Sequence, residues 1–147
     1  MHELKEIGMK EFDETAQLFL RVFTSDPWND DWSDPDQLNR YLTDLLAQDI
    51  SLAYGLYLDG VLSGVSMGYI KHWYSGTEYY INELFIRMDA QGKGLGTVFL
   101  KEIEEAVRKR GITRIFLQTE STVPAYGFYL KNGFTELKEH VSFTKQL

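Results

Sequence analysis

The sequence contains no cysteine, which excludes a disulfide framework, a cysteine nucleophile and a thiolate metal site. Histidine is scarce too, and His2, His72 and His140 are too scattered to indicate a metal site. Positive charge is limited: 15 lysines and arginines against 22 aspartates and glutamates give a formal net charge of −7. This balance disfavours nucleic acid as a partner, because phosphate contacts dominate that affinity, and it suits a cationic molecule or peptide.

Long apolar runs are also missing. No stretch is long enough to cross a bilayer, and the first residues lack the basic and apolar regions of a secretory signal. The 147 residues can bury one hydrophobic core, and no linker or repeat divides them. We therefore expect one soluble, cytoplasmic domain over residues 1–147, with neither a membrane nor a metal as partner.

Hydrophobic periodicity predicts alternating helices and strands of an α+β class. Helices are expected over residues 9–23, 35–48 and 95–110, with a fourth beginning near Pro124. Strands are expected over 2–8, 51–58, 61–74, 77–87 and 113–118, with 134–137 and 140–144 as a closing antiparallel pair. The helix between 77–87 and 113–118 makes those two strands parallel neighbours. The predicted sheet is therefore mixed but mostly antiparallel, flanked by about four helices.

A glycine-rich turn follows the apolar strand that ends near Arg87, and a helix follows the turn. Its alternate glycines allow positive φ and leave backbone N–H groups uncovered, and the helix adds its own free amides. The turn is therefore suited to a phosphate or pyrophosphate. A Walker A loop would need Ser or Thr after Lys93, and a dinucleotide fingerprint would place Gly or Ala at Thr97.

Two segments resemble one family. Gln91-Gly92-Lys93-Gly94-Leu95-Gly96 is similar to the Gln/Arg-x-x-Gly-x-Gly/Ala signature of the GCN5-related N-acetyltransferases, the GNAT superfamily. The segment 125–134 resembles that family's Phe-Tyr-x-x-x-Gly-Phe sequence. The resemblance implies a GNAT-like fold, acetyl-CoA as co-substrate, and a parallel pair of strands at the acyl-CoA cleft.

The resemblance also implies which residues hold acetyl-CoA. Backbone around Leu84, Phe85 and Ile86 would contact the pantetheine and the thioester carbonyl. Tyr126 is expected near the cofactor too. The pyrophosphate would be held by the turn and the start of the helix, namely Gln91, Gly92, Lys93, Gly94, Leu95, Gly96 and Thr97. Val123 stands where many members have an asparagine, which removes one usual pantetheine contact.

Glu83 is the only carboxylate within the largely apolar stretch 81–86 of the expected strand. Charged residues seldom lie in buried strands without a partner or a purpose. One interpretation makes Glu83 a general base whose pKa is raised by partial burial, a role that a glutamate at this place has in many family members. The alternative is a structural carboxylate paired with a lysine or a backbone amide.

Tyr129 matches the tyrosine that many family members use as a general acid toward the sulfur of CoA. A phenol can donate a proton to a thiolate as it forms. The alternative is that Tyr129 packs on the sheet and only hydrogen-bonds the thioester region. Tyr126 lies one helical turn earlier and is a neighbour that could substitute for it.

The acceptor site is expected in the loop over residues 26–35, together with aromatic residues at the end of the expected strand 61–74, because aromatic and acidic residues suit a cationic amine. The expected acceptor residues are Trp28, Asp30, Asp31, Trp32, Trp73 and Tyr74. Alternatively, the loop tryptophans only cap the hydrophobic core from outside. The acceptor would be the primary amine of an aminoglycoside, a polyamine or an amino-acid derivative, with a peptide N-terminus also open.

The favoured function is an acetyl-CoA-dependent N-acetyltransferase in which the amine attacks directly, since no cysteine can form a covalent intermediate. The alternative is a non-catalytic acyl-CoA-binding sensor or regulatory module. Glu83 and Tyr129 favour the enzyme, because a pure binder needs neither. The family often dimerises through its late strands, so a homodimer is also considered.

Overall fold

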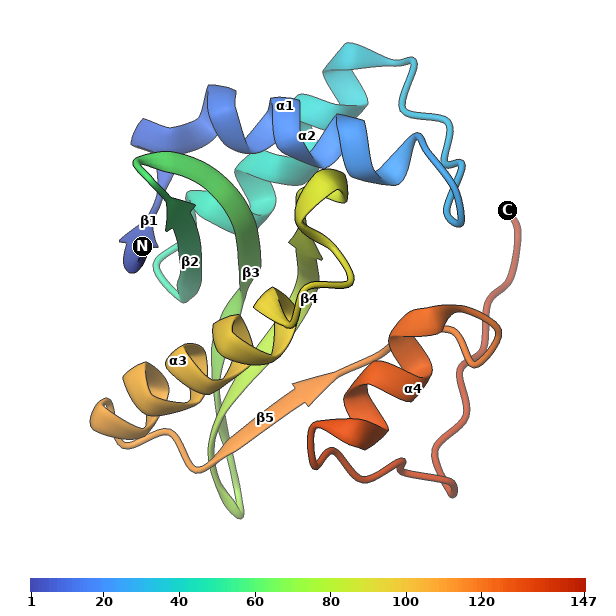
Figure 1. Ribbon diagram of the computed structural model, residues 1–147. Helices are drawn as coiled ribbons and strands as arrows, with labels where there is room; N and C mark the ends of the chain where they lie inside the picture. Colours follow the sequence, from blue (N-terminus) through green and yellow to red (C-terminus); the bar gives the residue numbers. More distant parts are fainter.

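A five-stranded sheet lies at the centre of the computed structural model, which describes residues 1–147. The strands are β1 (His2–Ile7), β2 (Ser51–Leu58), β3 (Val61–Trp73), β4 (Gly76–Ile86) and β5 (Arg114–Leu117), in that spatial order. β1 to β4 pair antiparallel, and β5 pairs parallel to β4. The predicted mixed sheet is therefore confirmed (Figure 1).

Four α-helices flank the sheet, as predicted. They are α1 (Phe12–Phe23), α2 (Pro35–Leu46), α3 (Leu95–Lys109) and α4 (Pro124–Lys131), and short 3-10 turns cover Met9–Glu11 and Met88–Ala90. Asp34 begins α2, because its carboxylate accepts from the N–H groups of Asp36 and Gln37, and Pro35 needs no partner there. Gly111 ends α3 with a φ of 79°.

Two apolar clusters lie on opposite faces of the sheet. The larger joins α1 and α2 to inward residues of β2, β3 and β4, among them Ala53, Val65 and Phe85. The smaller lies under α3 and includes Leu52 and Tyr79. Because side chains alternate along a strand, β2 contributes to both clusters. α1 and α2 thus cover one face and α3 the other (Figure 1).

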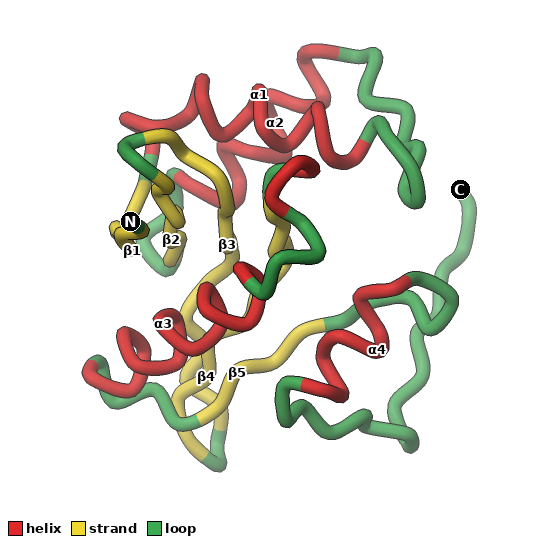
Figure 2. Tube along the Cα trace, in the orientation of Figure 1, coloured by secondary structure: helices red, strands yellow, loops and turns green.

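The expected closing strands, 134–137 and 140–144, are absent. Figure 2 shows the chain after α4 as loop throughout. Each run is short and neither pairs with β5, and a two-stranded hairpin without a sheet is marginal in water. The outer edge of β5 therefore has no strand beside it.

Candidate active site

β4 and β5 separate about halfway along β4. Their pairing runs from Glu78 and Arg114 to Ile81 and Leu117, while β4 continues to Ile86. The Arg87 N–H donates to the Ser63 carbonyl on β3 at 2.7 Å. Because N–H groups alternate in direction along an antiparallel strand, those of Leu84 and Ile86 face the open side instead. The Phe85 amide faces β3, so two of the three predicted backbone donors point into the gap.

The glycine turn lies between β4 and α3. Gly92 and Gly94 have φ of 74° and 78°, which an alanine would adopt only with strain. No backbone carbonyl accepts from the N–H groups of residues 92–97. Gln91 secures the turn, because its side-chain amide donates to the Ile86 carbonyl at 2.9 Å. Six free amides beside Lys93 and the positive end of α3 fit a pyrophosphate.

Gly96 has a different role from its neighbours. It does not adopt positive φ, and a Cβ built on it would lie 3.0 Å from the Phe128 ring. The missing side chain therefore lets α4 approach the start of α3. Leu95 and Thr97 belong to the first turn of α3, where helical amides lack partners.

A β-bulge orients Glu83. β3 pairs Met67 with Glu83 and Gly68 with Ile81, so Asn82 has no partner. Before the bulge, Ile81 packs in the cluster under α3, and after it Leu84 packs against that same cluster. Glu83 consequently faces the α1 and α2 side. A regular strand would have directed it toward α3.

Glu83 meets a tyrosine there. The Tyr41 hydroxyl of α2 donates to Glu83 Oε1 at 2.9 Å, and Glu83 takes part in no ion pair. Burial, together with the nearby negative charge of Asp30, raises the pKa of Glu83 to about 7, although the Tyr41 hydrogen bond opposes the shift. The predicted raised pKa is therefore present, and neither expected structural partner, a lysine or a backbone amide, is found.

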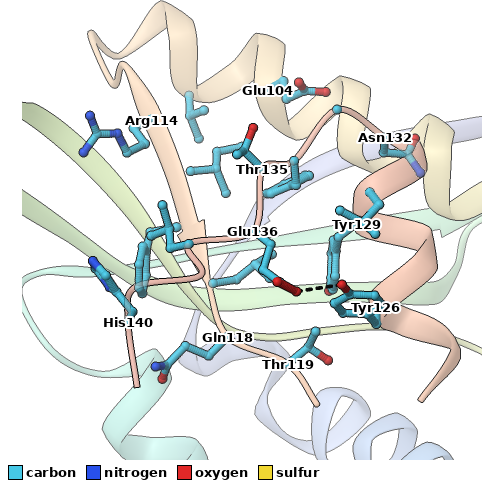
Figure 3. A pocket seen from close by; sticks show the side chains of 18 of the residues that line it. Glu104, Arg114, Gln118, Thr119, Tyr126, Tyr129, Asn132, Thr135, Glu136 and His140 are labelled. Carbon is cyan, nitrogen blue, oxygen red and sulfur yellow. Dashed lines mark hydrogen bonds between the residues drawn. The ribbon is translucent and has the colours of Figure 1, made fainter. Parts of the chain in front are cut away.

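Tyr129 projects from α4 with its ring 5.2 Å from that of Phe134. Burial raises the pKa of Tyr129, and the negative charge of Glu83 raises it further, so the phenol keeps its proton at neutral pH. Tyr126, one turn earlier, donates instead to Glu136 at 2.6 Å (Figure 3). The structure thus gives the two tyrosines of the predicted pair different surroundings.

A small acidic pocket of about 320 Å³ lies in the loop between α1 and α2. It is lined by Asp30, Asp31, Trp32, Asp34 and Gln37. The Trp32 ring stacks on Tyr41 with centroids 5.3 Å apart, which joins the pocket to the partner of Glu83. Trp28 packs instead on Phe23 at 5.6 Å. Both tryptophans cover the core under α1 and α2, as the alternative interpretation expected, and Trp32 lines the pocket as well.

Trp73 and Tyr74 lie away from these groups, at the tip of the β3–β4 hairpin. Both are exposed, at 47% and 90% of their surface. β3 runs six residues from Met67, the partner of Glu83, to Trp73, which is roughly 20 Å of strand. The structure therefore does not bring these two aromatic residues to Glu83.

A larger cavity, of about 660 Å³, lies elsewhere, between β5, α3, α4 and the segment after α4 (Figure 3). Tyr126 and Tyr129 line it, whereas Glu83 and the glycine turn do not. Tyr41 is the site residue that sequence reasoning missed, since its spacing from Leu38 and Leu45 puts it on the apolar face of the expected helix 35–48. A buried tyrosine hydroxyl needs a polar partner, and that requirement was the available signal.

The model of the acetyltransferase (GNAT) family matches residues 12–134. The chain belongs to this family. This GNAT domain has no match among curated protein sequences. None of its helices combines the length and apolarity needed to cross a bilayer.

Solved structures share the fold of this GNAT domain. An aminoglycoside acetyltransferase from an uncultured soil metagenomic sample, crystallised with sisomicin, is 19% identical with a TM-score of 0.76, covering 99% of this chain and 96% of that one. The aminoglycoside N-acetyltransferase AAC(6')-Iy, crystallised with CoA, is 14% identical with a TM-score of 0.76, over 100% and 96%. A ribosomal-protein-alanine N-acetyltransferase from Brucella melitensis is 15% identical with a TM-score of 0.75, over 100% of both chains.

Proposed function

We propose that this GNAT domain transfers an acetyl group from acetyl-CoA to a primary amine of a small cationic molecule. The observation that carries the proposal is the bulge at Asn82. It turns Glu83 toward α2, where it meets Tyr41 and the negative charge of Asp30, while the amides of Leu84 and Ile86 face the gap between β4 and β5. One short stretch therefore presents a base on one side and donors on the other.

The residues fit acetyl-CoA, which supplies an activated acyl group when bound. The free amides of residues 92–97 would hold its pyrophosphate. The Leu84 and Ile86 amides would donate to the thioester oxygen, where negative charge develops during attack. This arrangement resembles an oxyanion hole made of backbone donors.

Glu83 would take a proton from the acceptor, and Tyr129 would give one to the leaving group. With a pKa of about 7, Glu83 is substantially ionised at neutral pH and can take a proton from the acceptor's ammonium group, directly or through water. The amine nitrogen then bonds to the acetyl carbon as the carbon–sulfur bond breaks. Tyr129 would give its proton to the leaving sulfur, and the second proton that the nitrogen loses as it becomes a neutral amide would restore the phenol, directly or through water.

The acidic pocket supports a cationic acceptor. Asp30, Asp31 and Asp34 put three carboxylates beside the Trp32 face, which suits an amine that carries more than one positive charge. Among the structural neighbours are enzymes named for aminoglycosides and for a ribosomal protein. At 14–20% identity they share the fold and do not select the acceptor.

The experiment has two steps. Thermal shifts are measured with acetyl-CoA, CoA, ATP and NAD, because a ligand at 100 times its Kd stabilises by about 2.7 kcal/mol. Thiol release is then followed with an aminoglycoside, a polyamine, an amino-acid amide and a peptide beginning with alanine. Glu83→Gln should keep the acetyl-CoA shift but lose about 100-fold or more in turnover.

Each alternative predicts a different result. A shift with acetyl-CoA but no thiol release with any amine favours the non-catalytic acyl-CoA-binding module. Turnover with the peptide alone contradicts the small-molecule acceptor. The absence of any shift with acetyl-CoA or CoA contradicts both functions.

A further inference from the structure

Tyr41 is the one polar side chain that is hydrogen-bonded to Glu83. It lies on α2, directly after the loop that forms the acidic pocket. We propose that Tyr41 is a positioning residue that fixes the Glu83 carboxyl toward the acceptor and joins it, through Trp32, to the acidic pocket. This inference rests on the proposed role of Glu83 as base. It assigns a function to a helix residue that no motif includes.

The Tyr41 ring is held on two sides. Trp32 stacks on it at 5.3 Å with an angle of 22° between the planes, and Phe19 of α1 lies 6.1 Å away. A ring so confined can place its hydroxyl in few positions. The hydroxyl lies 2.9 Å from Glu83 Oε1, so Oε2 remains available to accept a proton.

The charges around Glu83 make this hydrogen bond more important. Three elements bring titratable groups to Glu83: the loop between α1 and α2 brings Asp30, α2 brings Tyr41 and α4 brings Tyr129. Asp30 opposes ionisation of Glu83, as burial does, and the Tyr41 hydrogen bond favours it. No lysine or arginine shares that task. A hydrogen bond to a charged group is stronger than one between neutral groups, so this one can decide whether the carboxyl is ionised at neutral pH.

Trp32 extends the arrangement to the acceptor. The same indole lines the acidic pocket and stacks on Tyr41, so an amine bound against Trp32 contacts the side chain that keeps Tyr41 in place. Contacts therefore connect the pocket to Trp32, Trp32 to Tyr41, and Tyr41 to Glu83. Tyr41 therefore positions the base without needing to touch the substrate.

Tyr41→Phe tests the inference, because it removes the hydroxyl and keeps the stacked ring. Tyr57→Phe is the matched control, since the Tyr57 hydroxyl also bonds a glutamate, Glu14 at 3.3 Å, on another part of the fold. Side-chain carboxyl carbons are titrated by ¹³C NMR in both variants and in the unmodified protein. Glu83→Gln identifies the Glu83 signal by its loss.

In Tyr41→Phe the Glu83 midpoint should move to higher pH, and in Tyr57→Phe it should stay in place. The acid limb of kcat/KM should move with the midpoint, giving about a tenfold loss at pH 6 and a smaller one at pH 9. The KM for acetyl-CoA should not change. A Glu83 midpoint that is unmoved in Tyr41→Phe overturns the inference, as does a moved midpoint with an unmoved kinetic limb.

The titration requires no turnover, so the two proposals fail separately. An unmodified protein that releases no thiol with any amine contradicts the proposed function before a variant is made. If the enzyme is active but the Glu83 midpoint does not move in Tyr41→Phe, only the positioning role is contradicted.

Discussion

Ile81 and Glu83 are two residues apart on β4, yet their side chains lie on opposite faces of the sheet. Ile81 packs in the cluster under α3, and Glu83 bonds Tyr41 of α2. The unpaired Asn82 between them reverses the alternation. One inserted residue therefore determines whether the carboxylate faces the acceptor loop or the α3 side.

Gly68 is the residue that permits this arrangement. A Cβ at Gly68 would lie 1.8 Å from the Tyr80 carbonyl oxygen, so Gly68→Ala must displace backbone on β4. We expect the free energy of unfolding to fall by about 3 kcal/mol in urea titrations. Gly8→Ala is the control, since a Cβ there meets nothing within 4 Å, and it should change stability by about 0.5 kcal/mol or less. Equal stabilities for the two variants would contradict the close approach.

Glu83→Gln should stabilise the protein at alkaline pH. The pKa of Glu83 is about 7 in the folded protein against 4.5 for a free side chain, so folding favours its protonated form. Its contribution is complete below pH 4.5 and is lost as the pH rises through 7. The variant should therefore match the unmodified protein near pH 4.5 and exceed it by up to about 3 kcal/mol at pH 8. Urea titrations at the two pH values measure this, and a pH-independent difference would contradict it.

Asp30→Asn should move the acid limb of kcat/KM to lower pH, opposite to Tyr41→Phe. Its negative charge raises the pKa of Glu83, and the isosteric amide removes that charge. Asp31→Asn removes a neighbouring charge from the same pocket and should leave the limb in place. Both variants should raise the KM of a cationic acceptor, most clearly at low salt. An acid limb of kcat/KM that shifts equally in the two variants would show that Asp30 has no specific effect on the pKa of Glu83.

Tyr129→Phe should lower kcat by about 100-fold, because the leaving sulfur loses its proton donor, while the acetyl-CoA-induced thermal shift persists. Tyr126→Phe provides the comparison, since its hydroxyl bonds Glu136. We expect it to affect turnover little. Loss of acetyl-CoA binding with unchanged kcat in Tyr129→Phe would indicate a packing role.

Gly94→Ala should weaken acetyl-CoA binding and cost about 1 kcal/mol of stability, because the residue has a φ of 78° and starts α3. Gly127→Ala lies within α4 where a Cβ meets nothing, and it should stabilise the protein by about 0.5–1 kcal/mol. Urea titration and acetyl-CoA thermal shifts measure the two effects. Similar results for both variants would contradict a conformational need for glycine in the turn.

Local patterns predicted much of this molecule. The alternation of apolar residues predicted the strands, the glycines predicted the anion-binding turn, and the proline after Asp34 predicted the start of α2. Each of these signals depends only on neighbours in the chain. Glu83 was singled out because it is the lone carboxylate in the largely apolar stretch 81–86. The free N–H groups beyond Ile81 follow from how far β5 runs alongside β4, which no local pattern records.

Three features lay outside such reasoning. The bulge leaves the composition of β4 unchanged, and Tyr41 meets Glu83 across 42 residues of sequence. The closing strands were predicted from alternating apolar residues such as Val141 and Phe143, but the structure leaves both exposed. An apolar alternation specifies a strand only where a sheet edge receives it.

No residue of the short helix α4 is completely buried, Tyr129 being partly buried, and no strand follows the helix. In the proposed reaction the base thus stands on a central strand and the acid on a lightly anchored segment. Local opening free energies are lowest where little apolar surface is buried. Inactivation on warming would then be set by the detachment of α4, well before the cooperative melting of the sheet, and a donor molecule that bridges α3 and α4 would postpone it.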